Sequence, residues 1–69
     1  LMEKAEFELE DFNLRGSPEN LVKLLEQWPD QIHVADRYSA SDIYVRVHDD
    51  FVDDLYESCE ALDIDISWK

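Results

Sequence analysis

Two stretches of the chain carry apolar residues at the spacing of an amphipathic helix, and they constrain the fold more than any other feature. The first stretch has apolar residues at i, i+3, i+4 and i+7, namely Leu21, Leu24, Leu25 and Trp28. Ser17 is a suitable N-cap, Pro18 fits the first helical position, and Pro29 ends the helix. The sequence therefore predicts a first helix over residues 18–28.

The second stretch opens at Asp49 or Asp50 and matches the helical template at five positions: Val52, Leu55, Tyr56, Cys59 and Leu62. Cys59 belongs to this apolar stripe, so we interpret it as a small core residue. It is the single cysteine of the chain, which excludes an internal disulfide and favours a reducing cytoplasm.

Short alternating segments flank both helices and predict strands. In the first, residues 4–9, Ala5, Phe7 and Leu9 are expected to face inward and Glu6, Glu8 and Glu10 outward. Phe12 is out of phase with this pattern, which predicts a bulge or strand end at Glu10–Asp11. Residues 32–34 and 43–47 predict a hairpin, and residues 64–68 predict the last strand.

The order strand, helix, strand, strand, helix, strand predicts one α+β domain over residues 1–69. The expected type is ferredoxin-like βαββαβ, a four-stranded antiparallel sheet with two helices on one face and strand order 4-1-3-2. The open sheet face would then show Asp65, Ser67, Glu6, Glu8 and Glu10 on one half. On the other half it would show Tyr44, Arg46, His48, His33 and Arg37. This face is a candidate dimer surface, so we expect a monomer or a homodimer formed through it.

The charge balance determines the sign of any partner. Eighteen Asp and Glu against six Lys and Arg give a formal net charge of −12. Direct binding to DNA, RNA or an anionic membrane needs cationic side chains, so we exclude these ligands. The longest apolar run covers only residues 43–45, too short for a transmembrane helix. We expect a basic protein partner. We expect the protein to act in the cytoplasm, or in the host cytoplasm if it is phage-encoded.

The sequence contains no arrangement typical of catalysis, metal binding or cofactor binding. Cys59 and His48 are expected on opposite sides of the sheet, which prevents a Cys–His pair. The acids of residues 49–54 lack the glycine of a calcium loop, and no Cys/His cluster fits zinc. An RNA-binding sheet would need aromatic residues where the first strand has glutamates. We therefore predict a protein that is not an enzyme and has no cofactor; a carboxylate enzyme using Glu10 and Asp65 is the least favoured alternative.

The remaining acids form a stripe on the polar side of the second helix. Its members are Asp50, Asp53, Asp54, Glu57 and Glu60. At ~1.5 Å per residue the stripe spans about 15 Å, or ~4 Å per carboxylate, close to the ~3.4 Å per phosphate of a DNA strand. Four strand acids, Glu6, Glu8, Glu10 and Asp65, are expected to add a second patch. The alternative interpretation is a solvated face, although no lysine interrupts the stripe.

In size, acidity and compact α+β pattern the chain resembles the small DNA-mimic inhibitors made by phages, including anti-CRISPR proteins. The residues that carry the resemblance are the helical stripe and Glu6, Glu8 and Glu10. The resemblance implies a non-catalytic protein that blocks a DNA-binding effector complex by shape and charge. Two alternatives remain: an immunity or antitoxin protein that caps a basic toxin or nuclease, and a halophile domain whose acidity serves solubility.

Overall fold

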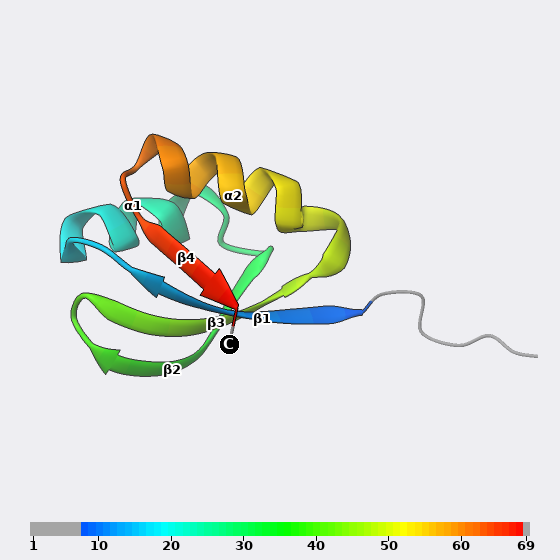
Figure 1. The fold of residues 1–69 in the computed structure, drawn as a ribbon, viewed down its shortest axis with the longest axis horizontal. Helices are drawn as coiled ribbons and strands as arrows, with labels where there is room; N and C mark the ends of the chain where they lie inside the picture. The colour runs from blue at the N-terminus through cyan, green and yellow to red at the C-terminus, as the bar shows by residue number, and fades with distance from the viewer. Residues whose placement is uncertain (1–7, 69) are drawn as a thin grey trace, which may run out of the picture.

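The computed structural model describes residues 8–68, with helices and strands that alternate in the predicted order (Figure 1). In chain order the elements are β1 (Leu9–Arg15), α1 (Pro18–Gln27), β2 (Ile32–Ser39), β3 (Asp42–His48), a 3₁₀ turn η1 (Asp49–Phe51), α2 (Val52–Ala61) and β4 (Asp65–Trp68). The predicted α+β class, with four antiparallel strands and two helices, is confirmed.

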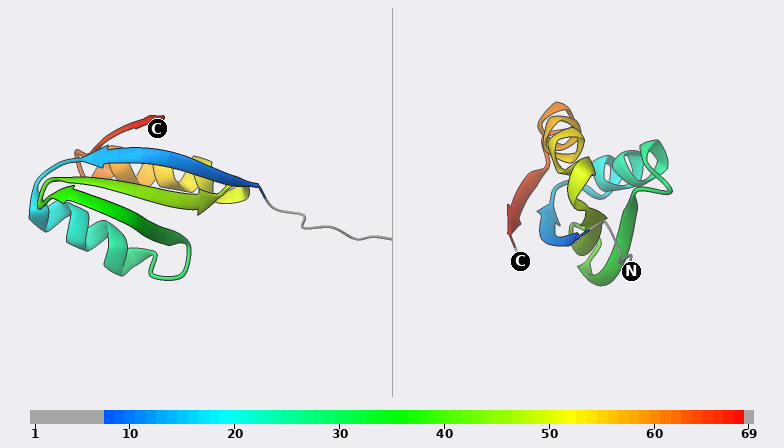
Figure 2. Two further views of the ribbon diagram at one scale, coloured as in Figure 1. Left: turned by 90° about the horizontal axis from the view of Figure 1, so that it is seen from below. Right: turned by 90° about the vertical axis from the view of Figure 1, so that its right-hand side faces the viewer.

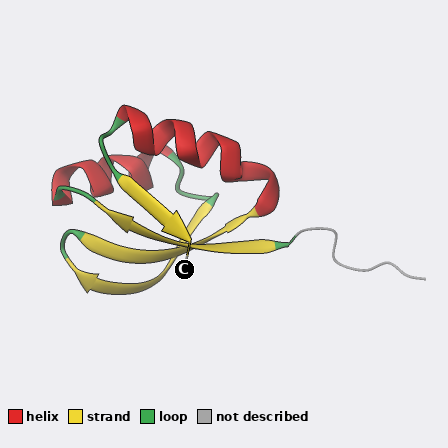
Figure 3. Cartoon of the chain, viewed as in Figure 1, coloured by secondary structure: helices red, strands yellow, loops and turns green. Residues whose placement is uncertain are grey.

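The strands form one sheet with the order β2-β3-β1-β4. β1 pairs with β3 on one side and with β4 on the other, and β2 and β3 form the predicted hairpin. Both helices lie on the same side of the sheet, and seen from below the strands stand in front of α2 (Figures 2 and 3). The other side, which we call the open face, is not covered by a helix of the described chain.

Both helix ends follow from local sequence. The backbone N–H of Asn20 donates to Ser17 Oγ at 3.2 Å, so Ser17 caps α1 as predicted. Asp63, just beyond α2, has a φ of 57° in the left-handed region, which an aspartate tolerates better than most residues. The N–H of Ile64 then donates to the carbonyl of Cys59 at 2.8 Å, which turns the chain from α2 into β4.

The core lies between the sheet and the two helices. Phe12 and Leu14 of β1 are fully buried, opposite Val45 and Ile43 of β3. The twelve buried apolar residues of the described chain are Phe12, Leu14, Leu21, Leu24, Ile32, Ile43, Val45, Val47, Phe51, Leu55, Cys59 and Ile64. Both predicted helical stripes therefore supply core residues, and Cys59 is one of them.

The predicted first strand was wrong in its position and in its facing. β1 begins at Leu9, whose side chain is 51% exposed, and runs on to Arg15. Because Phe12 and Leu14 face the core, Leu9 falls on the open face. A shift of one residue exchanges the two faces of a strand, and the larger apolar pair sets the register. Ala5, Phe7 and Glu6 lie outside the described residues.

A bulge in β2 corrects the expected position of a second side chain. The pairing of β2 with β3 is shifted between Val34 and Asp36. Asp36 therefore stands opposite Tyr44, on the open face, while Arg37 stands opposite Ile43, whose side chain faces the core. Arg37 was expected on the open face, but the extra residue moves it to the other side of its strand.

Candidate protein-binding surface

The exposed side of α2 carries four carboxylates, Asp53, Asp54, Glu57 and Glu60, which we call the α2 acidic face. Leu55 and Cys59 are buried on the opposite side of the same helix. At 3.6 residues per turn, Asp53, Glu57 and Glu60 lie within about 60° of one another around the helix axis. They span about 10 Å along that axis.

Asp50 does not continue this row in α-helical geometry. It is exposed, but it lies in the 3₁₀ turn η1 ahead of α2, where the chain turns and rises differently. The expected stripe of five evenly spaced acids is therefore regular only from Asp53 to Glu60. Asp50 lies beyond the N-terminal end of that row.

The α2 acidic face carries no compensating positive charge. Between Arg46 and Lys69 the sequence contains eight acids and no Lys or Arg. Within residues 8–68 both ion pairs lie on the open face of the sheet, and neither includes a residue of α2. Like charges at i+3 and i+4 on a helix destabilise it by about 0.2–0.5 kcal/mol per pair. Local helix stability therefore does not explain this arrangement.

The open face, in contrast, holds its acids in a hydrogen-bonded network. Asp11 accepts from Arg46 Nε and from the hydroxyl of Tyr44, each at 2.8 Å. The Arg46 hydrogen bond, with a smaller effect from Tyr44, holds the pKa of Asp11 below its ordinary value. Asp42 accepts from Asn13 Nδ2 at 2.6 Å and pairs with Arg15 at 3.5 Å.

The strand acids do not form the second patch that the sequence predicted. Glu10 is in phase with Phe12, so it lies on the helix side of β1, near the start of the strand, and is half-buried. Glu8 is exposed just before β1, and its carbonyl accepts from the N–H of Asp49 at 2.9 Å. Glu6 is outside the described residues. Asp65 is exposed on β4 opposite Arg15, where it was expected.

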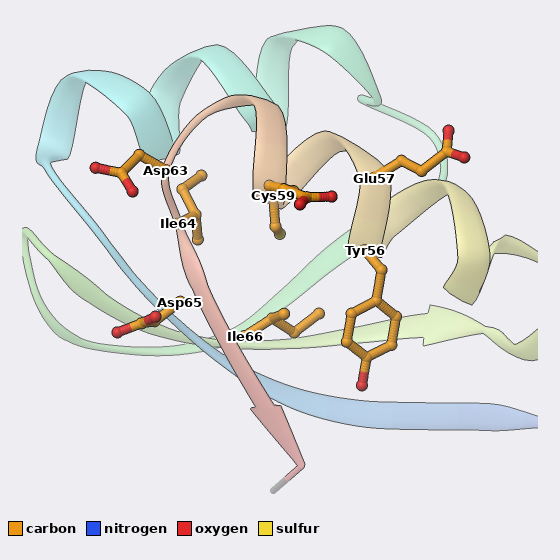
Figure 4. A pocket seen from close by; sticks show the side chains of 8 residues that line it. Tyr56, Glu57, Cys59, Asp63, Ile64, Asp65 and Ile66 are labelled. Carbon is orange, nitrogen blue, oxygen red and sulfur yellow. The ribbon is translucent and has the colours of Figure 1, made fainter.

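A groove of about 440 Å³ runs between α2 and β4 (Figure 4). Cys59, Ile64 and Ile66 supply its apolar side chains, and Tyr56 points from α2 toward the strands. Four acidic residues also border it: Glu57 and Glu60 from α2, Asp63 from the turn, and Asp65 from β4. The side chains of Asp63 and Asp65 point away from the groove in Figure 4. Asp65 stands between Ile64 and Ile66 in the strand, so its side chain faces the open side of the sheet, next to Arg15.

Burial raises the pKa of the Cys59 thiol to about 11. The thiol therefore stays protonated at neutral pH, and a protonated thiol is a poor nucleophile and metal ligand. Across residues 8–68, no group of three His, Cys, Asp or Glu side chains is placed to hold a metal ion. None of the described helices has the length and apolar character needed to cross a membrane.

A second hollow lies between the end of α1 and α2, and its polar contact has a structural role. Trp28 Nε1 donates to Ser58 Oγ at 3.0 Å, and the indole packs edge-on against Phe51 with ring centroids 4.8 Å apart. These contacts fasten the end of α1 to α2. We assign no binding role to this hollow.

Sequence reasoning missed the α2–β4 groove because it assigned the aromatic residues around it to the core. Trp68 is 66% exposed and Tyr56 is 39% exposed. Their rings contact the buried Phe12, with centroid distances of 5.0 Å for Trp68 and 5.8 Å for Tyr56. Alternation along 64–68 indicated which way Trp68 points, and the expected strand order placed this strand at the sheet edge, but neither showed how much of the ring stays exposed there.

No protein-family model matches this chain, and no curated protein matches its sequence. The role of the acidic surface must therefore be inferred from its own residues.

Proposed function

We propose that this protein is a non-catalytic inhibitor that binds a basic, nucleic-acid-binding protein and blocks its access to DNA. In this proposal the α2 acidic face takes the place of DNA phosphates, as in the anti-CRISPR-like proteins that the sequence resembles. The single observation that carries the proposal is the exposed row Asp53, Glu57 and Glu60, on a helix without a basic residue. The protein would act in the cytoplasm, or in the host cytoplasm if a phage encodes it.

The spacing of the acidic row supports this choice of partner. The four carboxylates of the α2 acidic face lie within about 10 Å of helix axis, a charge density close to that of one DNA strand, which has a phosphate every ~3.4 Å. A groove built to bind nucleic acid is lined with Lys and Arg, and it would attract such a row over a long range. The charge of −12 strengthens this attraction.

The sheet order supports the fold that we propose for this domain. Seen from its other edge the order is β4-β1-β3-β2, which agrees with the ferredoxin-like arrangement that we propose for the domain. Fold alone does not assign function, so the proposal depends on the charge pattern of α2 rather than on this class.

An immunity or antitoxin protein remains the second candidate, favoured by the compact groove beside the acidic helix. A toxin is capped by a small, shaped contact, whereas a DNA groove accepts an extended row of charge. The two functions differ in whether DNA and this protein exclude each other on the partner. A halophile domain, whose acidity serves solubility alone, would have no partner for which DNA competes.

The test is a competition assay on the captured partner. The partner is isolated by affinity to this protein and immobilised, and binding is measured with increasing duplex DNA. We expect DNA to displace the protein, and the association rate to fall steeply with ionic strength. Simultaneous and independent binding of both would overturn DNA mimicry and favour the capping function.

A matched pair of variants separates the acidic row from total charge. Asp53, Glu57 and Glu60 changed together to Ala should slow association at low salt by about tenfold or more. The control changes Glu19, Glu26 and Asp30 to Ala, three exposed acids on and after α1, and removes the same charge. Equal losses in both variants would mean that only net charge matters.

A further inference from the structure

The two edges of the sheet differ in how regular their pairing is. β2 forms one edge, and its pairing with β3 is shifted at two places. Such bulges disturb the spacing that a further strand needs and protect an edge from strand addition. β4 forms the other edge and pairs with β1 over four consecutive residues without a shift (Figure 2). Within residues 8–68, β4 is therefore the regular edge of the sheet, and no strand covers its outer side.

The pairing of β1 determines which way the backbone groups of β4 point. The N–H of Gly16 donates to the carbonyl of Ser41, on the β3 side, at 3.1 Å. At the other end of β1, the carbonyl of Glu8 accepts from the N–H of Asp49 at 2.9 Å. Backbone groups alternate in direction along a strand, so even-numbered residues of β1 bond to β3 and odd-numbered residues bond to β4.

The same alternation identifies the outward-facing backbone groups of β4. Asp65 and Ser67 stand opposite odd-numbered residues of β1, so their N–H and carbonyl groups bond to that strand. The N–H and carbonyl of Ile66 and the N–H of Trp68 therefore point away from the sheet. These are the donors and acceptors with which an extended segment pairs when it adds to a sheet edge.

The side chains of β4 differ between its two faces. Ile66 and Trp68 are on the helix side, and the Trp68 ring, 66% exposed, rests on the buried Phe12 with centroids 5.0 Å apart. Tyr56 of α2 meets the same Phe12 ring edge-on. Exposed rings held against a buried neighbour lose little conformational entropy when a partner covers them. The open face of β4 is polar, and Asp65 is exposed there.

We propose that β4 pairs with an extended segment of the basic protein partner, which adds a further strand to the sheet. The inference rests on the proposed function and names the part of the partner that the protein recognises. Backbone hydrogen bonds along β4 hold the segment, and the side chains on the two faces of β4 select it. Apolar β-branched residues pair well with Ile66 and Trp68, and basic residues are attracted on the polar face. A segment that alternates these two kinds of residue fits this edge.

Charge favours a basic partner over a second copy of this chain. Two copies joined at β4 would each bring a net charge of −12 and would place their Asp65 side chains along the same edge. Like charges brought together in this way oppose pairing. A basic segment is attracted instead, because Glu57 and Glu60 of the α2 acidic face border the groove beside β4. The segment on β4 and the acidic face of α2 would form one continuous contact with the partner.

The experiment uses the protein with a blocked peptide of alternating lysine and valine residues, and follows amide hydrogen exchange by NMR. In the free protein the amide of Ile66 should exchange faster than those of Asp65 and Ser67, which bond to β1. Saturating peptide should slow the exchange of Ile66 by about tenfold or more, because its N–H then donates to the peptide. No saturable binding, or binding without protection of Ile66, would overturn the proposal.

Two N-methylated versions of the peptide test the backbone pairing from the other side. Only alternate N–H groups of an added strand face its neighbour. For an antiparallel strand with its valines on the side of Ile66, methylation of the valine nitrogens should abolish binding and methylation of the lysine nitrogens should not. A parallel strand reverses the two results and also supports pairing. Equal affinities of the two methylated peptides would mean that side chains alone bind the peptide, which would overturn the proposal.

A matched pair of variants tests whether β4 is the edge that binds. Trp68→Ala should weaken binding of the lysine–valine peptide several-fold. Tyr38→Ala, the control, removes another exposed aromatic side chain from the opposite edge strand β2 and should leave the affinity almost unchanged. Both side chains are exposed, so both variants should fold, which circular dichroism checks. Equal losses in the two variants, or equal binding of a glutamate–valine peptide, would contradict the proposed site.

Sedimentation of the free protein tests the competing occupant, a second copy. We expect a monomer whose Ile66 amide exchanges at a rate independent of protein concentration. A dimer that protects Ile66 as the concentration rises would assign this edge to self-association and overturn the proposal.

These outcomes are independent of the DNA competition assay. If the peptide does not pair with β4 while DNA still displaces the protein from its partner, DNA mimicry stands and the edge proposal fails. If the peptide pairs with β4 but DNA does not compete, strand addition stands and the capping function replaces DNA mimicry.

Discussion

The open face of the sheet and the outer side of α2 both carry several carboxylates, but the two surfaces differ in whether these carboxylates are paired with cations. On the open face, Asp11 and Asp42 are each bound by an arginine and by a neutral donor. On α2, the acidic face has only other acids as charged neighbours along the helix. The acids of the open face therefore contribute to the fold, whereas those of α2 oppose it slightly.

This difference indicates which acids are available to a partner. A paired carboxylate must give up its arginine before it binds another cation, and that exchange gains little. An unpaired carboxylate loses only its bound water when it meets a cation, and the cation also reduces the repulsion from neighbouring acids. The acids of α2 therefore offer a stronger net interaction with a basic partner than an equal number of acids on the open face.

The largest expected effect is the loss of stability when the apolar side of α2, which packs against the core, is changed instead of its acidic face. Leu55 is fully buried, so Leu55→Ala should lower the free energy of unfolding by about 2–5 kcal/mol, most of the stability of so small a domain. The control is Val22→Ala on α1, where the side chain is 52% exposed. Urea unfolding measures both variants. A small loss for Leu55→Ala would mean that packing does not fix α2.

Sequence patterns predicted the helices well and β1 poorly, for a physical reason. Each helix has one apolar stripe at one phase, so only one face could be buried. The start of the chain has two apolar sets of opposite parity, one ending at Leu9 and one formed by Phe12 and Leu14. Which set is buried depends on pairing with β3, a contact about thirty residues away in the chain.

The candidate site was predictable only as far as it lies within one helix. The exposure of Asp53, Glu57 and Glu60 follows from helical period alone. The groove depends on how α2 lies over the edge of the sheet, and no local pattern contains that information. Tyr56 shows the limit: the helical period assigned it to the apolar stripe, but its side chain is 39% exposed beside the groove.

An intermediate effect tests the pairing on the open face through its pH dependence. The pKa of Asp11 is lowered by Arg46 and then by Tyr44, so its stabilising contribution is present above the ordinary aspartate pKa of 3.8. That contribution is lost as the pH falls through the lowered value. Asp11→Asn should therefore melt below the parent at about pH 6, and the difference should disappear near about pH 2.

The control for this pH series is Asp30→Asn, an exposed acid outside the network. Its melting temperature should stay close to that of the parent at about pH 6. If Asp11→Asn and Asp30→Asn follow the same pH curve, the hydrogen bonds to Asp11 contribute nothing to stability, and the contrast between the two surfaces is lost.

The smallest effect tests the repulsion on α2 directly. Glu57 has Asp53, Asp54 and Glu60 at helical spacing, so Glu57→Lys replaces three repulsions with attractions and should stabilise the fold by about 0.5–1 kcal/mol at low salt. Glu26→Lys on α1 is the control, because Glu26 has Lys23 three residues before it and the change adds a repulsion.

Thermal melts at low and high sodium chloride measure both variants. Salt screens these charges, so the gain of Glu57→Lys should shrink as salt is added, while the parent itself becomes more stable. Two results would contradict this: a parent that melts at a lower temperature with added salt, or a Glu57→Lys variant that is less stable than the parent. Either result would show that the α2 acidic face stabilises the fold, so that folding alone would explain the acids.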